Sequence, residues 1–248
     1  MRPEKSEAII LYTYASRERD KLVVFLTPDH GKMKGWAYGA RSARSRFGAS
    51  LEPLTKVHLT WYEKETEEVV RIEAIDLIRS LFSAQQHLVP SLAATYIAEN
   101  VDTFALAHDP AELLYRLLDR TSNALLEGVP VEPLLAWFEI WMLRLAGIFP
   151  SIRECADCQR PLSSALRYDE LRGVFLCDEC GRSVGKVVPN DVVAGIAAIL
   201  RQPVEEFAVA SPRPELIFEI RAFARWLRRN FLGYELKSHD LLQQMLTG

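Results

Sequence analysis

All four cysteines of the chain lie in one short segment, as two pairs of identical spacing. The pairs are Cys155 with Cys158 and Cys177 with Cys180. Two CxxC units separated by 18 residues are typical of a zinc site, since each unit supplies two thiolates to one tetrahedral ion. Four thiolates leave no open coordination position, so we expect one structural Zn²⁺ ion. The alternatives are buried free thiols or a redox pair.

Residues 31–48 form a second candidate site, because they are basic and aromatic and contain no acidic residue. A binder of single-stranded nucleic acid needs cations along the phosphates and flat side chains on which bases stack. The residues that we expect to contact DNA are Lys32, Lys34, Trp36, Tyr38, Arg41, Arg44 and Arg46. The alternative is a solvated basic hairpin in which Trp36 and Tyr38 belong to the core.

Four arginines lie along a predicted C-terminal helix beside its apolar stripe. They are Arg221, Arg225, Arg228 and Arg229. They suggest a second DNA-binding surface. Long basic side chains often only cover apolar surface with their stems, however, and Glu219 and Glu235 weaken the basic stripe.

The composition is that of an ordinary globular protein, with 248 residues, 49% hydrophobic and 25% charged. No stretch approaches the roughly 18 apolar residues of a membrane span, and acids occupy the place of a signal peptide's apolar core. We therefore expect a cytoplasmic protein. The net charge of −3 divides into +5 for residues 1–50 and −8 for the rest, which indicates an anionic partner for one part only. No nucleophile, base or nucleotide-binding motif stands out, so we expect no catalytic residues and no enzymatic activity.

The predicted elements change type near residue 80. Residues 1–80 contain five short alternating runs with glycines at bends, which predict an OB-like five-stranded β-barrel, although an SH3-like barrel fits nearly as well. Helical periodicity follows, and one helix is expected to begin with Asp109 as its N-cap. The fold class is thus α+β, with a helical bundle at 81–150, a zinc-binding insertion at 151–190 and helices at 191–248 that complete the helical domain.

Two segments of the chain resemble the N-terminal signature of the bacterial RecO recombination mediators. These are LVVFLTPDHGK at 22–32 and GARSARSRFGASLEPL at 39–54. The order of a helical bundle, a CxxC…CxxC insertion and closing helices is also similar. The resemblance spans essentially the whole chain.

The resemblance implies an OB-fold and a role in the RecF pathway of DNA repair. Such proteins bind single- and double-stranded DNA and anneal complementary strands without nucleotide hydrolysis. They act with RecR and single-strand-binding protein to let RecA load, which implies a nucleoid-associated location. By position, Lys32, Arg41, Arg44 and Arg46 match the family's basic signature, and the four cysteines match its zinc insertion. The alternative function is a zinc-ribbon adaptor of transcription or RNA handling that works mainly through protein contacts.

Overall fold

The computed structural model describes residues 3–16, 18–42, 45, 47–63, 68–162, 166–210 and 213–247. Arg44 and Arg46 lie outside the described residues. By their contacts, the residues form two units, which are 1–131 together with 236–248, and 132–235. The four-segment division expected from the sequence stays a prediction.

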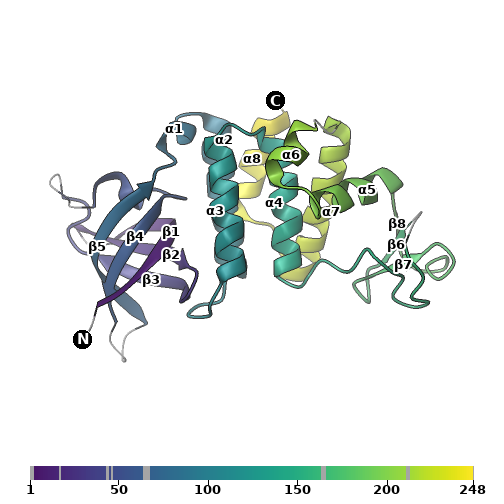
Figure 1. Ribbon diagram of the computed structural model, residues 1–248, viewed down its shortest axis with the longest axis horizontal. Helices are drawn as coiled ribbons and strands as arrows, with labels where there is room; N and C mark the ends of the chain where they lie inside the picture. Colours follow the sequence, from purple (N-terminus) through teal and green to yellow (C-terminus); the bar gives the residue numbers. More distant parts are fainter. Residues whose placement is uncertain are drawn as a thin grey trace. The chain divides into compact units, whose positions relative to one another are not determined.

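The N-terminal strands close into a five-stranded barrel (Figure 1, purple to blue). They are β1 (Pro3–Ser16), β2 (Asp20–Thr27), β3 (Gly31–Ala37), β4 (Lys56–Tyr62) and β5 (Val69–Arg79). The strand order is β1-β2-β3-β5-β4, in which β1 pairs antiparallel with both β2 and β4, and β3 pairs parallel with β5. The predicted OB-like barrel and the α+β class are therefore confirmed.

Alternating side chains decide which face of each barrel strand is buried. In β3, Met33, Gly35 and Ala37 are buried, whereas Lys32, Lys34 and Trp36 point to the other face. The barrel interior is a single apolar cluster, with the following members: Ala8, Ile10, Val23, Phe25, Met33, Ala37, Phe47, Leu51, Val57, Leu59, Trp61, Val70 and Ile72.

The described part of the first unit also contains α-helices. They are α1 (Phe82–Gln85), α2 (Leu88–Phe104), α3 (Glu112–Leu126) and α8 (Lys237–Thr247). Helix α2 contacts α8, and both α2 and α3 contact β1. The carboxylate of Glu99 in α2 accepts hydrogen bonds from the backbone N–H groups of Lys237 and Ser238 at 2.9 and 2.8 Å. These bonds satisfy donors at the start of α8 that have no partner within the helix.

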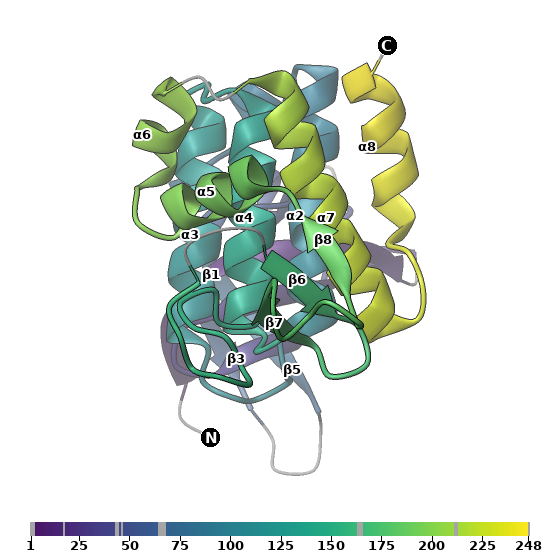
Figure 2. The same ribbon diagram turned by 90° about the vertical axis from the view of Figure 1, so that its right-hand side faces the viewer.

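The second unit combines helices with a small sheet. Its elements are α4 (Val131–Leu145), β6 (Leu166–Asp169), β7 (Val174–Cys177), β8 (Lys186–Val188), α5 (Asn190–Ile199), α6 (Val204–Val209) and α7 (Pro214–Leu232). The sheet has the order β7-β6-β8, and Figure 2 shows β8 leading into α5. The indole N–H groups of Trp137 and Trp141 in α4 donate to the carbonyls of Gln202 and Ile199. None of the helices that the structure describes is long and apolar enough to cross a membrane.

Candidate nucleic-acid interface and metal centre

The outer face of β3 and β5 carries exposed cations beside aromatic rings. Parallel pairing sets Trp36 opposite Arg71, and Lys34 lies two residues earlier on the same face. Lys34 is exposed, and the Arg71 side chain is 63% exposed although its Nη2 lies 3.7 Å from Glu73 Oε2. The Arg71 guanidinium lies 5.9 Å from the centroid of the exposed Tyr38 ring, which is within cation–π range. Neither Trp36 nor Tyr38 belongs to the interior cluster of the barrel.

Two loops add cations at one end of this face. The backbone N–H of Gly39 donates to Asp20 Oδ1 at 2.9 Å, and that of Arg41 donates to the carbonyl of Arg19 at 2.9 Å. These bonds join the β1–β2 loop to the segment after β3, and both arginines are exposed. The residues that we call the barrel basic face are Arg19, Lys34, Trp36, Tyr38, Arg41 and Arg71.

Arg19 and Arg71 belong to this face although they lie outside the basic, aromatic motif at residues 31–48. Arg71 lies in a strand that follows β3 by more than thirty residues in the sequence, and only the parallel β3–β5 register places it beside Trp36. Alternation with Val70 and Ile72 already places Arg71 on the outer side of β5. The sequence pattern therefore predicts that Arg71 points outward, but it does not predict which residues lie beside it.

Lys32 lies on the outer side of β3 but is bound to the helical part of its own unit. Its Nζ is 3.2 Å from Asp102 Oδ1 and also donates to the Asp102 carbonyl, and its side chain is only 18% exposed. Its backbone bonds the 106–108 segment at both N–H and C=O. The neighbouring Gly31 has φ of +66°, and a Cβ there would lie 1.9 Å from the Asp109 carbonyl oxygen. Lys32 therefore has a docking role, because it holds strand β3 against the 102–108 segment of the helical part.

The arginines of α7 are largely neutralised by acids of their own unit. Arg221 is 7% exposed with Nη2 3.4 Å from Glu139 Oε1, and Arg228 is 2% exposed with Nη2 2.7 Å from Glu235 Oε1. Arg225 also pairs with Glu235, at 2.6 Å. Arg221 and Arg228 are therefore buried and paired with acids of their own unit, and the second DNA-binding surface expected from the four arginines stays a prediction. Arg229 is exposed, 3.9 Å from Glu235.

The four cysteines come together at the β6–β7 hairpin. Their sulfurs all lie within 4.8 Å of one another, and Cys158 Sγ is 3.8 Å from Cys177 Sγ. Sulfurs bound to one tetrahedral zinc ion at about 2.3 Å lie about 3.8 Å apart, so the cluster has the size that the ion requires. Cys155 is buried, and the other three are half-buried. The chain therefore brings four thiols close enough to bind one metal ion.

Both cysteine pairs sit in turns of the same form. The N–H of Gln159 donates to the carbonyl of Cys155, and the N–H of Gly181 donates to that of Cys177, each at 2.9 Å. In each case the donor is four residues after the first cysteine of its pair. Gly181 is closely packed, since a Cβ there would lie 2.7 Å from Cβ of Arg167. Two turns with the same backbone hydrogen bond therefore bring the two cysteine pairs together.

The electrostatics of the cluster fit a divalent cation. Burial raises the pKa of Cys155, but the backbone N–H groups of Cys158, Cys177 and Asp157 outweigh it and lower the pKa to about 6. Hydrogen bonding with the Cys177 and Cys158 side chains raises the pKa of Cys180 to about 12. One sulfur is therefore ready to ionise while another is held protonated by its neighbours. A bound cation removes this conflict, since metal binding deprotonates coordinating thiols.

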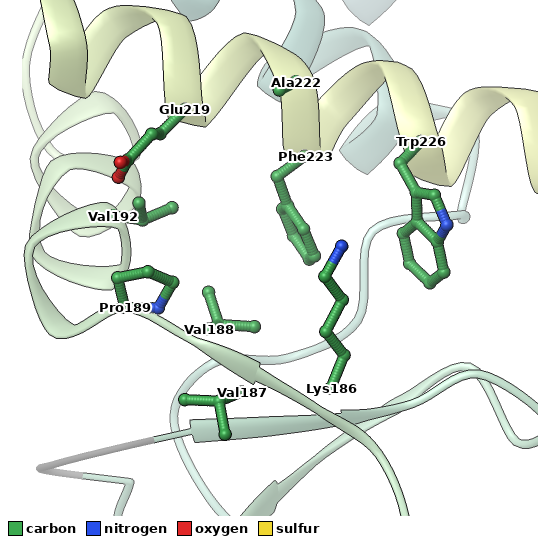
Figure 3. A pocket seen from close by; sticks show the side chains of 9 residues that line it. All are labelled: Lys186, Val187, Val188, Pro189, Val192, Glu219, Ala222, Phe223 and Trp226. Atoms are coloured by element: carbon green, nitrogen blue, oxygen red, sulfur yellow. The ribbon is translucent and has the colours of Figure 1, made fainter.

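An aromatic cluster anchors this hairpin to α7. Tyr168 of β6 meets Phe223 and Trp226 edge-on, with ring centroids 5.9 and 5.1 Å apart. Beside them lies a pocket between β8–α5 and α7 (Figure 3), and its charged lining residues are Lys186 and Glu219. Lys186 Nζ lies 5.9 Å from the centroid of Trp226. The four-cysteine segment is thus packed onto the helices of its unit.

The barrel and the four-cysteine hairpin together define the class of protein: an OB-like barrel followed by a helical part with a four-cysteine segment that could hold a metal ion. Comparison with known proteins gives the family. The family model described as "Recombination protein O N terminal" matches residues 1–81, and that described as "Recombination protein O C terminal" matches residues 85–240. The chain belongs to the RecO family, as the sequence resemblance predicted.

Curated relatives agree with this assignment over most of the chain. The DNA repair protein RecO of Koribacter versatilis is 31% identical over 98% of this chain and 99% of its own. That of Anaeromyxobacter sp. strain K is 31% identical, covering 85% and 83%. That of Myxococcus xanthus is 28% identical, covering 96% of each. The chain is therefore similar to DNA repair proteins from end to end.

Proposed function

We propose that this protein is a non-enzymatic mediator of DNA repair and recombination. It binds single- and double-stranded DNA and anneals complementary strands. With RecR it helps RecA to load onto strands covered by single-strand-binding protein, in the cytoplasm and at the nucleoid. The observation that carries the proposal is the barrel basic face in a chain of the RecO family. OB-folds commonly bind oligonucleotides on the face that includes strands 2 and 3.

The barrel basic face has the two kinds of group that a single strand requires. Lys34, Arg41 and Arg71 offer exposed positive charge along the face. Trp36 and Tyr38 offer rings for base stacking, worth about 1–3 kcal/mol per base. Arg44 and Arg46 also belong to the proposed interface; they follow Arg41 in the sequence and lie outside the described residues. Lys32, which belongs to the same sequence motif, forms an ion pair with Asp102.

Annealing by such a surface needs no reaction step. Two complementary strands repel each other through their phosphates, and neutralising cations lower this barrier while releasing counterions. A strand held by its backbone and stacked on only some of its bases keeps the remaining base edges available for pairing. Sequence tolerance follows, because phosphates and ring faces are common to every nucleotide.

The proposed cofactor is one structural Zn²⁺ ion held by Cys155, Cys158, Cys177 and Cys180. The ion supplies a fixed cross-link between the two turns and no reaction chemistry, since all four ligands are protein thiolates. What the chain itself does is place the sulfurs and pack the hairpin on α7 through Tyr168. The observation in support is the spacing of the sulfurs.

A strand-annealing assay without ATP tests the proposal. Complementary labelled oligonucleotides are mixed with the full chain, first bare and then coated with single-strand-binding protein. We expect faster pairing on both substrates, and loss of the acceleration as salt rises. Binding without acceleration would point to the zinc-ribbon adaptor instead. Absence of binding at low salt would contradict a nucleic-acid role for the barrel basic face.

A further inference from the structure

One arginine bridges the two cysteine pairs of the metal site. Arg160 follows Cys158 by two residues, and its Nε donates to Cys158 Sγ at 3.4 Å. Its Nη2 donates to Oε2 of Glu179, which lies between Cys177 and Cys180. A single guanidinium thus contacts a sulfur of the first pair and a carboxylate of the second.

The backbone fixes this arginine at the site as well. The Cys155 N–H donates to the carbonyl of Arg160 at 2.9 Å, and Glu154 forms an antiparallel bridge with Pro161. The main chain on either side of the first pair therefore folds back on itself and determines where the Arg160 side chain begins. The position of the Arg160 guanidinium relative to Cys158 therefore depends on these backbone contacts as well as on the side-chain conformation.

Two further arginines make ion pairs with the acids of the same turns and offer a comparison. Arg172 Nη2 lies 2.7 Å from Asp157 Oδ1, and Arg167 Nε lies 2.8 Å from Asp178 Oδ1. The guanidinium hydrogen bonds that the structure describes for these two arginines go to carboxylates. Arg160 differs from them because it also donates to a ligand sulfur.

The charge of an occupied site explains why that donation matters. A zinc ion with four thiolates has a net charge of −2, and the thiolate of Cys158 is half-exposed to water. A charge-assisted N–H···S bond stabilises the thiolate form of Cys158. Groups that bond metal ligands from outside typically change metal affinity 10–100-fold when they are removed.

We propose that Arg160, oriented by Glu179, is a positioning residue of the metal site that retains the ion by holding the Cys158 thiolate. This inference rests on the proposed zinc site. It assigns the Arg160–Glu179 pair a role that the Arg172–Asp157 pair does not have. The pair acts through Cys158 and does not itself bind the metal.

The experiment measures zinc release from the purified full chain to a chromophoric chelator, comparing Arg160→Gln with Arg172→Gln. Both variants lose one positive charge and one ion pair at the same turns. We expect at least tenfold faster release from Arg160→Gln and less than threefold acceleration from Arg172→Gln. In the cobalt-substituted protein, the sulfur-to-metal charge-transfer band should shift in Arg160→Gln and stay in place in Arg172→Gln. Arg160→Lys keeps the charge but not the planar fork and should fall between wild type and Arg160→Gln.

Different failures identify different errors. A wild-type chain that binds no zinc overturns both the proposed zinc site and this inference. Normal zinc content in the wild type with equal release from both variants overturns this inference alone. If Arg160→Gln does not fold, Glu179→Gln replaces it, since it leaves the guanidinium without its orienting carboxylate. Release no faster than from Arg172→Gln would then refute the proposal.

Discussion

The most informative perturbation is a triple substitution on the barrel basic face, Lys34→Ala with Arg41→Ala and Arg71→Ala. All three side chains are exposed, and none belongs to the interior cluster of the barrel. We therefore expect the variant to keep its fold while losing three contacts to phosphates. Its affinity for single-stranded DNA should fall by a similar factor for every sequence, because phosphates are common to all of them.

The size of the effect follows from counterion release. Each phosphate contact to a single strand contributes about 0.7 to the slope of log K against log salt concentration, so three contacts contribute about 2. Between 50 and 200 mM salt, the wild type should lose about 15–20 times more affinity than the variant. Fluorescence anisotropy with a labelled oligonucleotide, at four or more salt concentrations, measures both slopes.

A matched control removes the same charge elsewhere. Lys5, Arg116 and Arg182 are exposed and lie outside the barrel basic face, and replacing all three with Ala also changes the net charge from −3 to −6. The control should keep the wild-type slope to within the contribution of one contact. If the two triple variants behave alike, the protein binds DNA through its overall charge, and the barrel basic face is not the interface.

Three other perturbations test separate parts of the structure. Asp102→Asn should lower the free energy of unfolding by about 1 kcal/mol, because it removes the half-buried ion pair with Lys32; an unchanged urea midpoint would contradict the docking role. Cys177→Ser should abolish zinc content and lower thermal stability, because metal binding is coupled to folding; one retained equivalent of zinc would refute the four-thiolate site. A hydrogen bond from Lys56 lowers the pKa of Glu7 in the folded protein below its ordinary value of 4.5. The Glu7 carboxylate therefore stabilises the fold at pH values above 4.5, and this stabilisation is lost as the pH falls from 4.5 through the lowered pKa of the folded protein. Glu7→Gln should therefore flatten the acid side of the stability profile measured by urea unfolding, and an unaltered profile would exclude the contribution.

The barrel was predictable because its signal is local. In β3, the alternation of Met33, Gly35 and Ala37 with larger polar residues already determines which side faces the interior. The strand order is not contained in that alternation, and the parallel β3–β5 pairing distinguishes the OB-like barrel from the SH3-like alternative. For the same reason the sequence did not place Arg71 beside Tyr38.

The start of α3 shows tertiary contacts overriding a local rule. Asp109 followed by Pro110 predicts an N-cap, but the helix begins at Glu112 with Ala111 as its cap and no side-chain capping bond. The N–H of Ala111 instead contributes a hydrogen bond to the carbonyl of Pro28, in the β2–β3 turn. The contact of this segment with the barrel requires a different backbone path. The Ala111–Pro28 hydrogen bond joins residues far apart in the sequence, and helix-capping rules consider only local residues.

The arginines of α7 show a related limit of local sequence patterns. Helical spacing gives their angular positions but not which angle faces the interior. The acid that pairs with buried Arg221 is Glu139, which is 82 residues away in the sequence. A buried charge needs a partner, so the four arginines of α7 are as consistent with buried ion pairs as with an exposed DNA-binding surface. The tertiary structure is needed to distinguish buried ion pairs from exposed charges.

The basic motif of the barrel also contains both paired and exposed cations, and this difference determines which residues should be substituted in a test of its function. Lys32 and Lys34 are two residues apart on one face of β3, yet one is paired with Asp102 and the other is exposed. Substituting the whole motif would lower stability and DNA affinity together, and neither cause could then be assigned. The four-cysteine site has no such ambiguity, because its ligands lie within a few residues of the turns that present them. Variants of the barrel should therefore spare Lys32, whereas the cysteines can be replaced one at a time.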